Sequence, residues 1–268
     1  MENIEGIIRG RRSVRTFEET ALTEADKEKL CAFMETIENP YRIPVQFKLM
    51  SAKESGLTCP VVVGTDLYVG GKIQRGESVA FGYSFEMLVL YAQSLGIGTV
   101  WLGGTMNRES FEKAMELSKD ETMPCASALG YPAQKMALRE KMMRKAVGAD
   151  KRNPFETLFF EGSFETPLTE EKAGKLAFPL EMVRWAPSAV NKQPWRAVVM
   201  ENAVHFYLER SRGFKYNETL DMQRIDMGIA LCHFDLAAKE IGLQPIFTQE
   251  DPEIAHEANV EYIASYKI

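Results

Sequence analysis

Apolar residues recur with a helical period in two long stretches of the chain, residues 82–95 and 228–241. Apolar residues dominate both stretches, which predicts two long and largely buried helices. A glycine follows each stretch, Gly96 and Gly242, and glycine readily adopts the left-handed conformation that ends a helix. Because the matching positions lie 146 residues apart, the pattern predicts an internal repeat.

A second pair of segments, residues 29–50 and 179–200, supports the repeat. Three residues are identical at an offset of 150: Leu30 and Leu180, Pro44 and Pro194, Met50 and Met200. Each segment predicts a helix, a polar loop and then a strand. Strands are predicted at residues 45–50, 59–64, 123–129, 197–200 and 204–208, with β-prone runs at 98–102 and 243–247.

These elements predict two halves, residues 1–150 and 151–268, with the charged stretch 139–151 as the crossover. Each half runs helix, strand, strand, central helix, strand. Alternating helices and strands favour an α/β or α+β sandwich in which helices cover a sheet.

Composition narrows the class of protein. The chain has 268 residues and a net charge of −6, which disfavours nucleic acid and anionic membranes as partners because those surfaces are themselves negative. Neither a signal peptide nor a membrane-spanning stretch is expected, so the cytoplasm is the expected location. The 4 cysteines form no CxxC pair and have no histidine at metal-ligand spacing. We expect no metal site and four buried, reduced thiols.

The first segment with candidate chemistry is RGRRSVRTF, residues 9–17, with four arginines within seven residues. Guanidinium groups match phosphate oxygens with paired donors, and Ser13 adds a hydroxyl. This predicts a phosphate-binding site, although composition alone favours a solvated basic turn.

The second segment is APSAVNKQPW, residues 186–195. Its prolines stiffen the loop, and its Ser, Asn and Gln side chains offer donors and acceptors suited to a flat heterocycle. Composition alone equally suits an ordinary surface loop.

The third segment is GTVWLGGTM, residues 98–106, a β-prone run that leads into two glycines. Glycines let the backbone approach a ligand closely, although a simple turn is their commoner use.

Taken together and in this order, the segments resemble the nitroreductase family of FMN enzymes. RRSVRTF resembles the family's phosphate-binding signature, and APSAVNKQPWR resembles its flavin-ring loop. LGIGTVWLGG resembles the strand beside the flavin N5, and ALGYP (residues 128–132) resembles the strand end before a second basic residue. The resemblance covers most of the chain, and its first two motifs are the specific ones.

The chain departs from the family in where it carries these motifs. Ordinary members carry both in one short chain and dimerise, with each flavin at the interface. Here the first half has IENPYRIPV (residues 37–45) where the ring loop belongs, and the second half has KRNPF (residues 151–155) where the arginine motif belongs. The resemblance therefore implies an internally duplicated pseudo-dimer, similar to the family's fused two-repeat subgroup, with one composite site and no need to dimerise.

Carried over residue by residue, the resemblance implies three sets of cofactor-binding residues. They are Arg11, Arg12, Ser13 and Arg15 at the phosphate, with a looser match at Arg139; Leu102, Gly103 and Gly104 near N5; and Pro187, Ser188, Ala189, Asn191 and Gln193 along the ring.

The implied function is oxidoreduction. FMN would take a hydride from NADH or NADPH and pass it, in a ping-pong cycle, to a small oxidised acceptor such as a nitroaromatic or a quinone. No side-chain acid or base is expected, and His233 and the three tryptophans are expected in the core. An FMN-binding carrier or sensor, a scaffold without flavin, and a different FMN chemistry remain alternatives.

Overall fold

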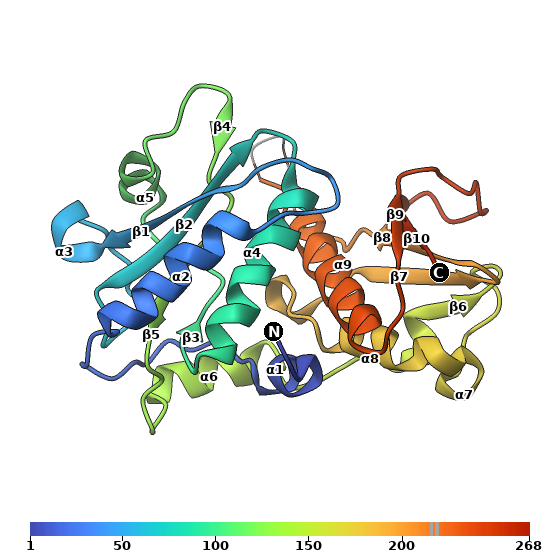
Figure 1. Ribbon diagram of the computed structural model, residues 1–268, viewed down its shortest axis with the longest axis horizontal. Helices are drawn as coiled ribbons and strands as arrows, with labels where there is room; N and C mark the ends of the chain where they lie inside the picture. The colour runs from blue at the N-terminus through green and yellow to red at the C-terminus, as the bar shows by residue number, and fades with distance from the viewer. Residues whose placement is uncertain (215–216, 218–219) are drawn as a thin grey trace.

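The computed structural model describes residues 1–214, 217 and 220–268, which form two sheets on either side of a central pair of helices (Figure 1). The first sheet has the order β1 (Gln46–Ser51), β2 (Leu67–Gln74), β5 (Ala126–Gly130) and β3 (Gly98–Thr99), with β4 (Glu121–Thr122) paired to β2. The second has the order β6 (Phe159–Glu161), β7 (Trp195–Met200), β8 (Ala203–Glu209), β10 (Val260–Lys267) and β9 (Ile246–Thr248). β6 runs parallel to β7, and the other pairs are antiparallel.

The two halves repeat one arrangement of elements. The path β1-β2-β5-β3 has the same order as β7-β8-β10-β9. Helix α2 (Glu24–Thr36) precedes β1 as α8 (Ala177–Trp185) precedes β7, and the central helices are α4 (Ser78–Ser94) and α9 (Met222–Glu240). The mixed helix and sheet fold with an internal duplication is therefore confirmed.

The central helices touch through a reciprocal glycine contact. A Cβ on Gly82 would lie 2.1 Å from the carbonyl oxygen of Ile225, and a Cβ on Gly228 would lie 2.0 Å from that of Val79. Gly82 and Gly228, like Val79 and Ile225, are 146 residues apart. Each helix thus offers the same patch to the other, which is the contact of a two-fold dimer inside one chain.

Most predicted strands are found, but the second strand of the first half lies later than expected. Residues 59–64 form a turn with one bridge, from Thr16 to Val63, and the strand that fills this place in the sheet is β2. Pro60 has no N–H to donate, and Gly64 packs against the Phe17 carbonyl at φ +89, so this segment cannot continue a ladder. The long strand β10 had no predicted counterpart.

The shorter helices include α1 (Ile4–Gly10), α3 (Ala52–Ser55), α5 (Arg108–Ala114), α6 (Leu138–Ala146) and α7 (Glu170–Ala173), with 3₁₀ turns at Phe155–Thr157, Gly174–Leu176 and Ala189–Asn191. In the described residues, no helix is both long and apolar enough to cross a membrane. Cys31 on α2 is exposed, which corrects the expectation of four buried thiols.

Candidate cofactor site

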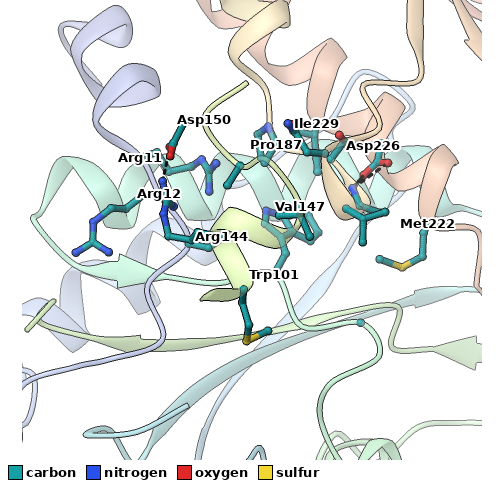
Figure 2. A pocket seen from close by; sticks show the side chains of 18 of the residues that line it. Arg11, Arg12, Trp101, Arg144, Val147, Asp150, Pro187, Met222, Asp226 and Ile229 are labelled. Atoms are coloured by element: carbon teal, nitrogen blue, oxygen red, sulfur yellow. Dashed lines mark hydrogen bonds and ion pairs between the residues drawn. The ribbon is translucent and has the colours of Figure 1, made fainter. Parts of the chain in front are cut away.

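A cavity of about 630 Å³ lies where the two halves meet (Figure 2). Its walls come from residues 9–15, 101–105, 143–152, 185–191 and the first two turns of α9. The volume falls within the roughly 300–1,000 Å³ that small-molecule and cofactor sites occupy. The three segments that the sequence singled out therefore meet around one space.

One end of the cavity is rich in arginine. Arg11, Arg15 and Arg144 come from the first half, and Arg152 comes from the second. Buried nitrogens without a hydrogen-bond partner among the described residues are Nε and Nη1 of Arg11, Nε of Arg15 and Nε of Arg152. An unpaired buried donor is costly, and an anion such as a phosphate would satisfy it.

Burial disfavours the charged, protonated form of these guanidinium groups. It lowers the pKa of Arg11, and the neighbouring Arg144 lowers it further while Glu86 opposes the shift. Burial, followed by the charge of Arg11, lowers the pKa of Arg152 to about 10. Bound negative charge would reverse both effects, so the chemistry of this end fits the phosphate of FMN.

Glu140 of α6 fixes the arginine segment in place. Its carboxylate is 2% exposed and accepts hydrogen bonds from Arg12 Nη1 at 3.1 Å, the Arg15 backbone N–H at 3.2 Å and Thr16 Oγ1 at 2.7 Å. Arg12 is thus already paired within the protein, whereas Arg11 keeps free donors. Arg12 therefore helps to position the arginine segment, whereas Arg11 has donors available for an anion.

The predicted ring loop is held in an unusual backbone conformation. Val190, Asn191 and Gln193 have φ of 44°, 57° and 51°. For a β-branched residue such as valine this region is a steric outlier, and strain of this kind concentrates at functional sites.

Side-chain amides of the loop sustain this conformation. Asn191 Nδ2 donates to the carbonyls of Gly148 at 2.8 Å and Lys151 at 2.9 Å, and Gln193 Oε1 accepts from the Asn153 N–H at 2.9 Å. Asn191 therefore ties the loop to the crossover segment, and Gln193 ties it to Asn153 just beyond that segment. Their bonds support the loop, and the Gln193 side chain, which is 2% exposed, does not line the cavity.

Asp226 of α9 lies at the opposite end of the cavity from the arginines (Figure 2). It is 2% exposed and accepts from the Ala189 N–H, at 2.9 Å to Oδ1 and 3.1 Å to Oδ2. Burial raises the pKa of this carboxyl well above its ordinary value. One turn earlier, Met222 packs against Gly103, where a Cβ would come within 2.9 Å of the methionine methyl.

Two tryptophans line the cavity, which corrects the expectation that all three are core residues; Trp195 alone is fully buried. Trp101 Nε1 donates to Glu86 Oε2 at 3.0 Å. Arg9 and Arg152 lie over the Trp185 ring at 4.8 and 5.0 Å from its centroid, as cation–π contacts.

His233 is fully buried and structural, as the sequence indicates. Its Nδ1 lies 2.9 Å from the Met182 carbonyl, which can only accept, so this nitrogen carries the hydrogen. Its Nε2 lies 2.9 Å from Glu86 Oε1. The histidine therefore links both central helices to the Trp101 wall.

Among the residues predicted to bind the cofactor, most line the cavity: Arg11, Arg12, Ser13, Arg15, Gly103, Gly104, Pro187, Ser188, Ala189 and Asn191. Leu102 is fully buried. Arg139 donates to the Pro60 carbonyl at 2.8 Å and lies outside the cavity, whereas Arg144 of the same helix lines the cavity. The sequence reasoning missed Arg144, Arg152, Trp101, Trp185, Met222 and Asp226 as lining residues.

Two aromatic side chains stand at positions related to this cavity by the internal repeat. Tyr41 stands 150 residues before Asn191, and Phe247 stands 146 residues after Trp101. Their rings contact each other edge to face at 4.7 Å. The two repeat-related positions therefore differ, since Trp101 and Asn191 line the cavity whereas Tyr41 and Phe247 pack against each other.

Comparison with known proteins shows the family and the fold of the chain. The family described as "Putative TM nitroreductase" matches residues 3–238, so the chain belongs to that family. The crystal structure of a "putative nitroreductase" from Thermotoga maritima is similar, with 21% identity, a TM-score of 0.61, and coverage of 100% of this chain and 94% of that one. That likeness shows a shared fold.

Single-repeat structures cover about half of this chain. A nitroreductase family protein from Clostridium novyi NT has 17% identity, a TM-score of 0.42, and coverage of 50% of this chain and 87% of that one. A "putative nitroreductase" from Desulfovibrio desulfuricans, solved in complex with FMN, has 21% identity, a TM-score of 0.42, and coverage of 53% and 95%. No curated protein matches the sequence.

Proposed function

We propose that the chain binds one FMN in the cavity between its halves and uses it for the NAD(P)H-dependent reduction of a small oxidised acceptor, such as a nitroaromatic or a quinone. One observation carries the proposal. Unpaired, buried guanidinium donors stand at one end of the cavity, and a strained loop of the family's ring-binding type stands at the other. Membership of a nitroreductase family supports it.

The residues fall into groups that would hold FMN. Arg11, Arg15 and Ser13 of the first half, with Arg144 and Arg152, would hold the phosphate. Pro187, Ser188 and Ala189 would lie along the ring, and Gly103 and Gly104 would give its reactive edge close access to backbone. Bound FMN would supply the hydride chemistry, while the protein supplies binding, orientation and electrostatics.

We further propose that residues 1–150 and 151–268 are the two repeats and that the chain works as a monomer in the cytoplasm. The reciprocal contact of Gly82 and Gly228 supports this, because the usual dimer interface of such a fold is here internal.

Variants in opposite halves test the composite site. Arg11→Met removes a free phosphate donor, and Asn191→Ala removes both bonds that tie the ring loop to the crossover. Arg11→Met should weaken FMN binding by about tenfold to a hundredfold, since a hydrogen bond to a charged group contributes about 1.5–3 kcal/mol. Asn191→Ala should weaken it by about twofold to tenfold, since the neutral hydrogen bonds that hold the loop contribute about 0.5–1.5 kcal/mol each. Fluorescence titration of FMN measures both.

Arg139→Met is the matched control, because Arg139 lies on α6 outside the cavity. It should bind FMN like the parent. If either Arg11→Met or Asn191→Ala also binds FMN like the parent, that half does not contribute as proposed.

A further inference from the structure

Asp226 is the exception among the buried acids of the described residues. Glu140 pairs with Arg12, Asp221 with Arg210, Asp235 with Lys239, and Glu86 faces His233. The carboxyl of Asp226 is 2% exposed, and the hydrogen bond found for it comes from the Ala189 backbone. No Lys, Arg or His in the described residues forms an ion pair with it.

The position of this acid in the cavity is equally specific. Its hydrogen bond to Ala189 holds it against the ring loop. Met222, on the same face of α9 one turn earlier, packs against Gly103. Asp226 therefore lies where the ring loop and the glycine segment approach each other, at the end of the cavity opposite the arginines (Figure 2).

We propose that Asp226 supplies the proton that accompanies hydride transfer to the acceptor, so that it is the catalytic acid of this cavity. The proposal rests on the proposed function and revises the sequence-based expectation of no side-chain acid. It also assigns the acceptor to compounds that gain a proton on oxygen as they are reduced.

The surroundings favour the protonated form of the acid, because burial raises its pKa. The ionisable groups that face it are Asp221 at the start of α9 and Cys125 before β5, and neither brings positive charge. Arg210 is engaged by Asp221, and Arg108 donates to the carbonyls of Gly103, Met123 and Pro124. A neutral carboxyl can accept the Ala189 N–H on its carbonyl oxygen and keep one O–H for a ligand.

The proton transfer balances for a quinone. One oxygen of the quinone gains the hydride that reduced FMN would supply, and the other oxygen gains the proton, which gives the hydroquinone. The O–H bond of Asp226 breaks, and its electron pair stays on the carboxylate. The carboxylate regains a proton from solvent before the next turnover.

The variant Asp226→Asn tests the role. It keeps the shape and the carbonyl that accepts from Ala189, but it has no acidic proton. We would compare two acceptors: benzoquinone, which takes up a hydride and a proton, and ferricyanide, which takes up electrons alone. The variant should reduce benzoquinone about a hundredfold more slowly than the parent, as general acids typically contribute, and ferricyanide at the parental rate. The rate of the parent with benzoquinone should fall as pH rises through the pKa of the acid, and that fall should be absent from the variant.

Stability of the protein without FMN gives an independent reading. A carboxyl whose pKa is raised in the folded state favours folding at low pH, and this contribution is lost as pH rises through the folded pKa. The unfolding constant of the parent, relative to Asp226→Asn, should therefore rise tenfold per pH unit from about pH 4 until Asp226 ionises. A ratio that does not change with pH would overturn the protonated state.

The outcomes separate the two proposals. A parent that binds no FMN overturns the proposed function and the acid together. A parent that binds FMN and oxidises NAD(P)H, with a variant that reduces both acceptors at parental rates, overturns the acid alone. A variant equally slow with both acceptors also overturns it, because Asp226 would then act on the cofactor and not on proton delivery.

Discussion

Replacing Gly82 with alanine places a methyl group where the backbone of α9 already lies. The new Cβ would stand 2.1 Å from the Ile225 carbonyl oxygen, whereas real Cβ atoms essentially never come within 3.0 Å of a neighbour. The obstacle is backbone and cannot turn aside, so the helices must separate by about 1 Å. Overpacking costs about 1–3 kcal/mol, and we take the upper end here. Alanine returns about 1 kcal/mol of helix propensity, which leaves a net loss of about 2 kcal/mol.

The repeat makes this prediction reciprocal. Gly228→Ala meets the Val79 carbonyl at 2.0 Å and should cost the same. At about 2–4 °C per kcal/mol, each variant should lower the Tm by about 4–8 °C in a circular-dichroism melt. The double variant should lose less than the sum, because one separation of the helices accommodates both methyl groups.

Gly104→Ala is the control for stability, because nothing lies within 4 Å of the added Cβ and its φ is not in the left-handed region. It should melt like the parent. Parental melting of both helix variants would refute the close helix contact, and strictly additive losses would refute the shared separation.

Three further perturbations follow from the site. Glu140→Ala should lower the free energy of unfolding by about 2–4 kcal/mol and weaken FMN binding, because three donors lose one buried acceptor; an unchanged urea midpoint would contradict this. Trp101→Phe should cost about 1–3 kcal/mol by leaving an oxygen of Glu86 unpaired, and parental stability would argue against the bond. The dissociation constant of FMN should rise with salt, more steeply in the parent than in Arg11→Met, and equal slopes would exclude Arg11 as a phosphate ligand.

The sequence predicted the duplication because a repeat depends on local patterns, whereas the meeting of three distant segments was implied by the family resemblance. Gly96 and Gly242 mark the ends of two similar helices at φ 74 and 82, and a helix can be read from its own periodicity. β10 was not predicted, although Val260, Tyr262, Ala264 and Tyr266 alternate with Glu261, Ser265 and Lys267. Strand β2 was not predicted because two buried glycines, Gly70 and Gly71, weaken its β pattern. Only the folded structure shows why these positions are glycine, since neighbouring side chains leave little room for a Cβ.

The site residues that sequence reasoning missed belong to tertiary structure. Asp226 is one of several polar residues of α9, and its burial without a cation, which only the folded structure shows, distinguishes it from a solvated side chain. Arg152 lies in the segment that stands where the second half would carry its arginine motif, yet in the fold it lines the same cavity as the arginines of the first half. The sequence predicts Asn191 and Gln193 as ring contacts from their amide groups, but in the fold Asn191 Nδ2 and Gln193 Oε1 bond to backbone and hold the loop.

The absorption spectrum of the purified protein, supplied with FMN and then with NADH or NADPH in the absence of oxygen, tests the central claim most directly. We predict a bound flavin spectrum at one FMN per chain that bleaches when the nucleotide is added. A flavin that binds but does not bleach would contradict the reductase and favour a carrier or sensor. A protein that takes up no FMN would contradict the composite site itself.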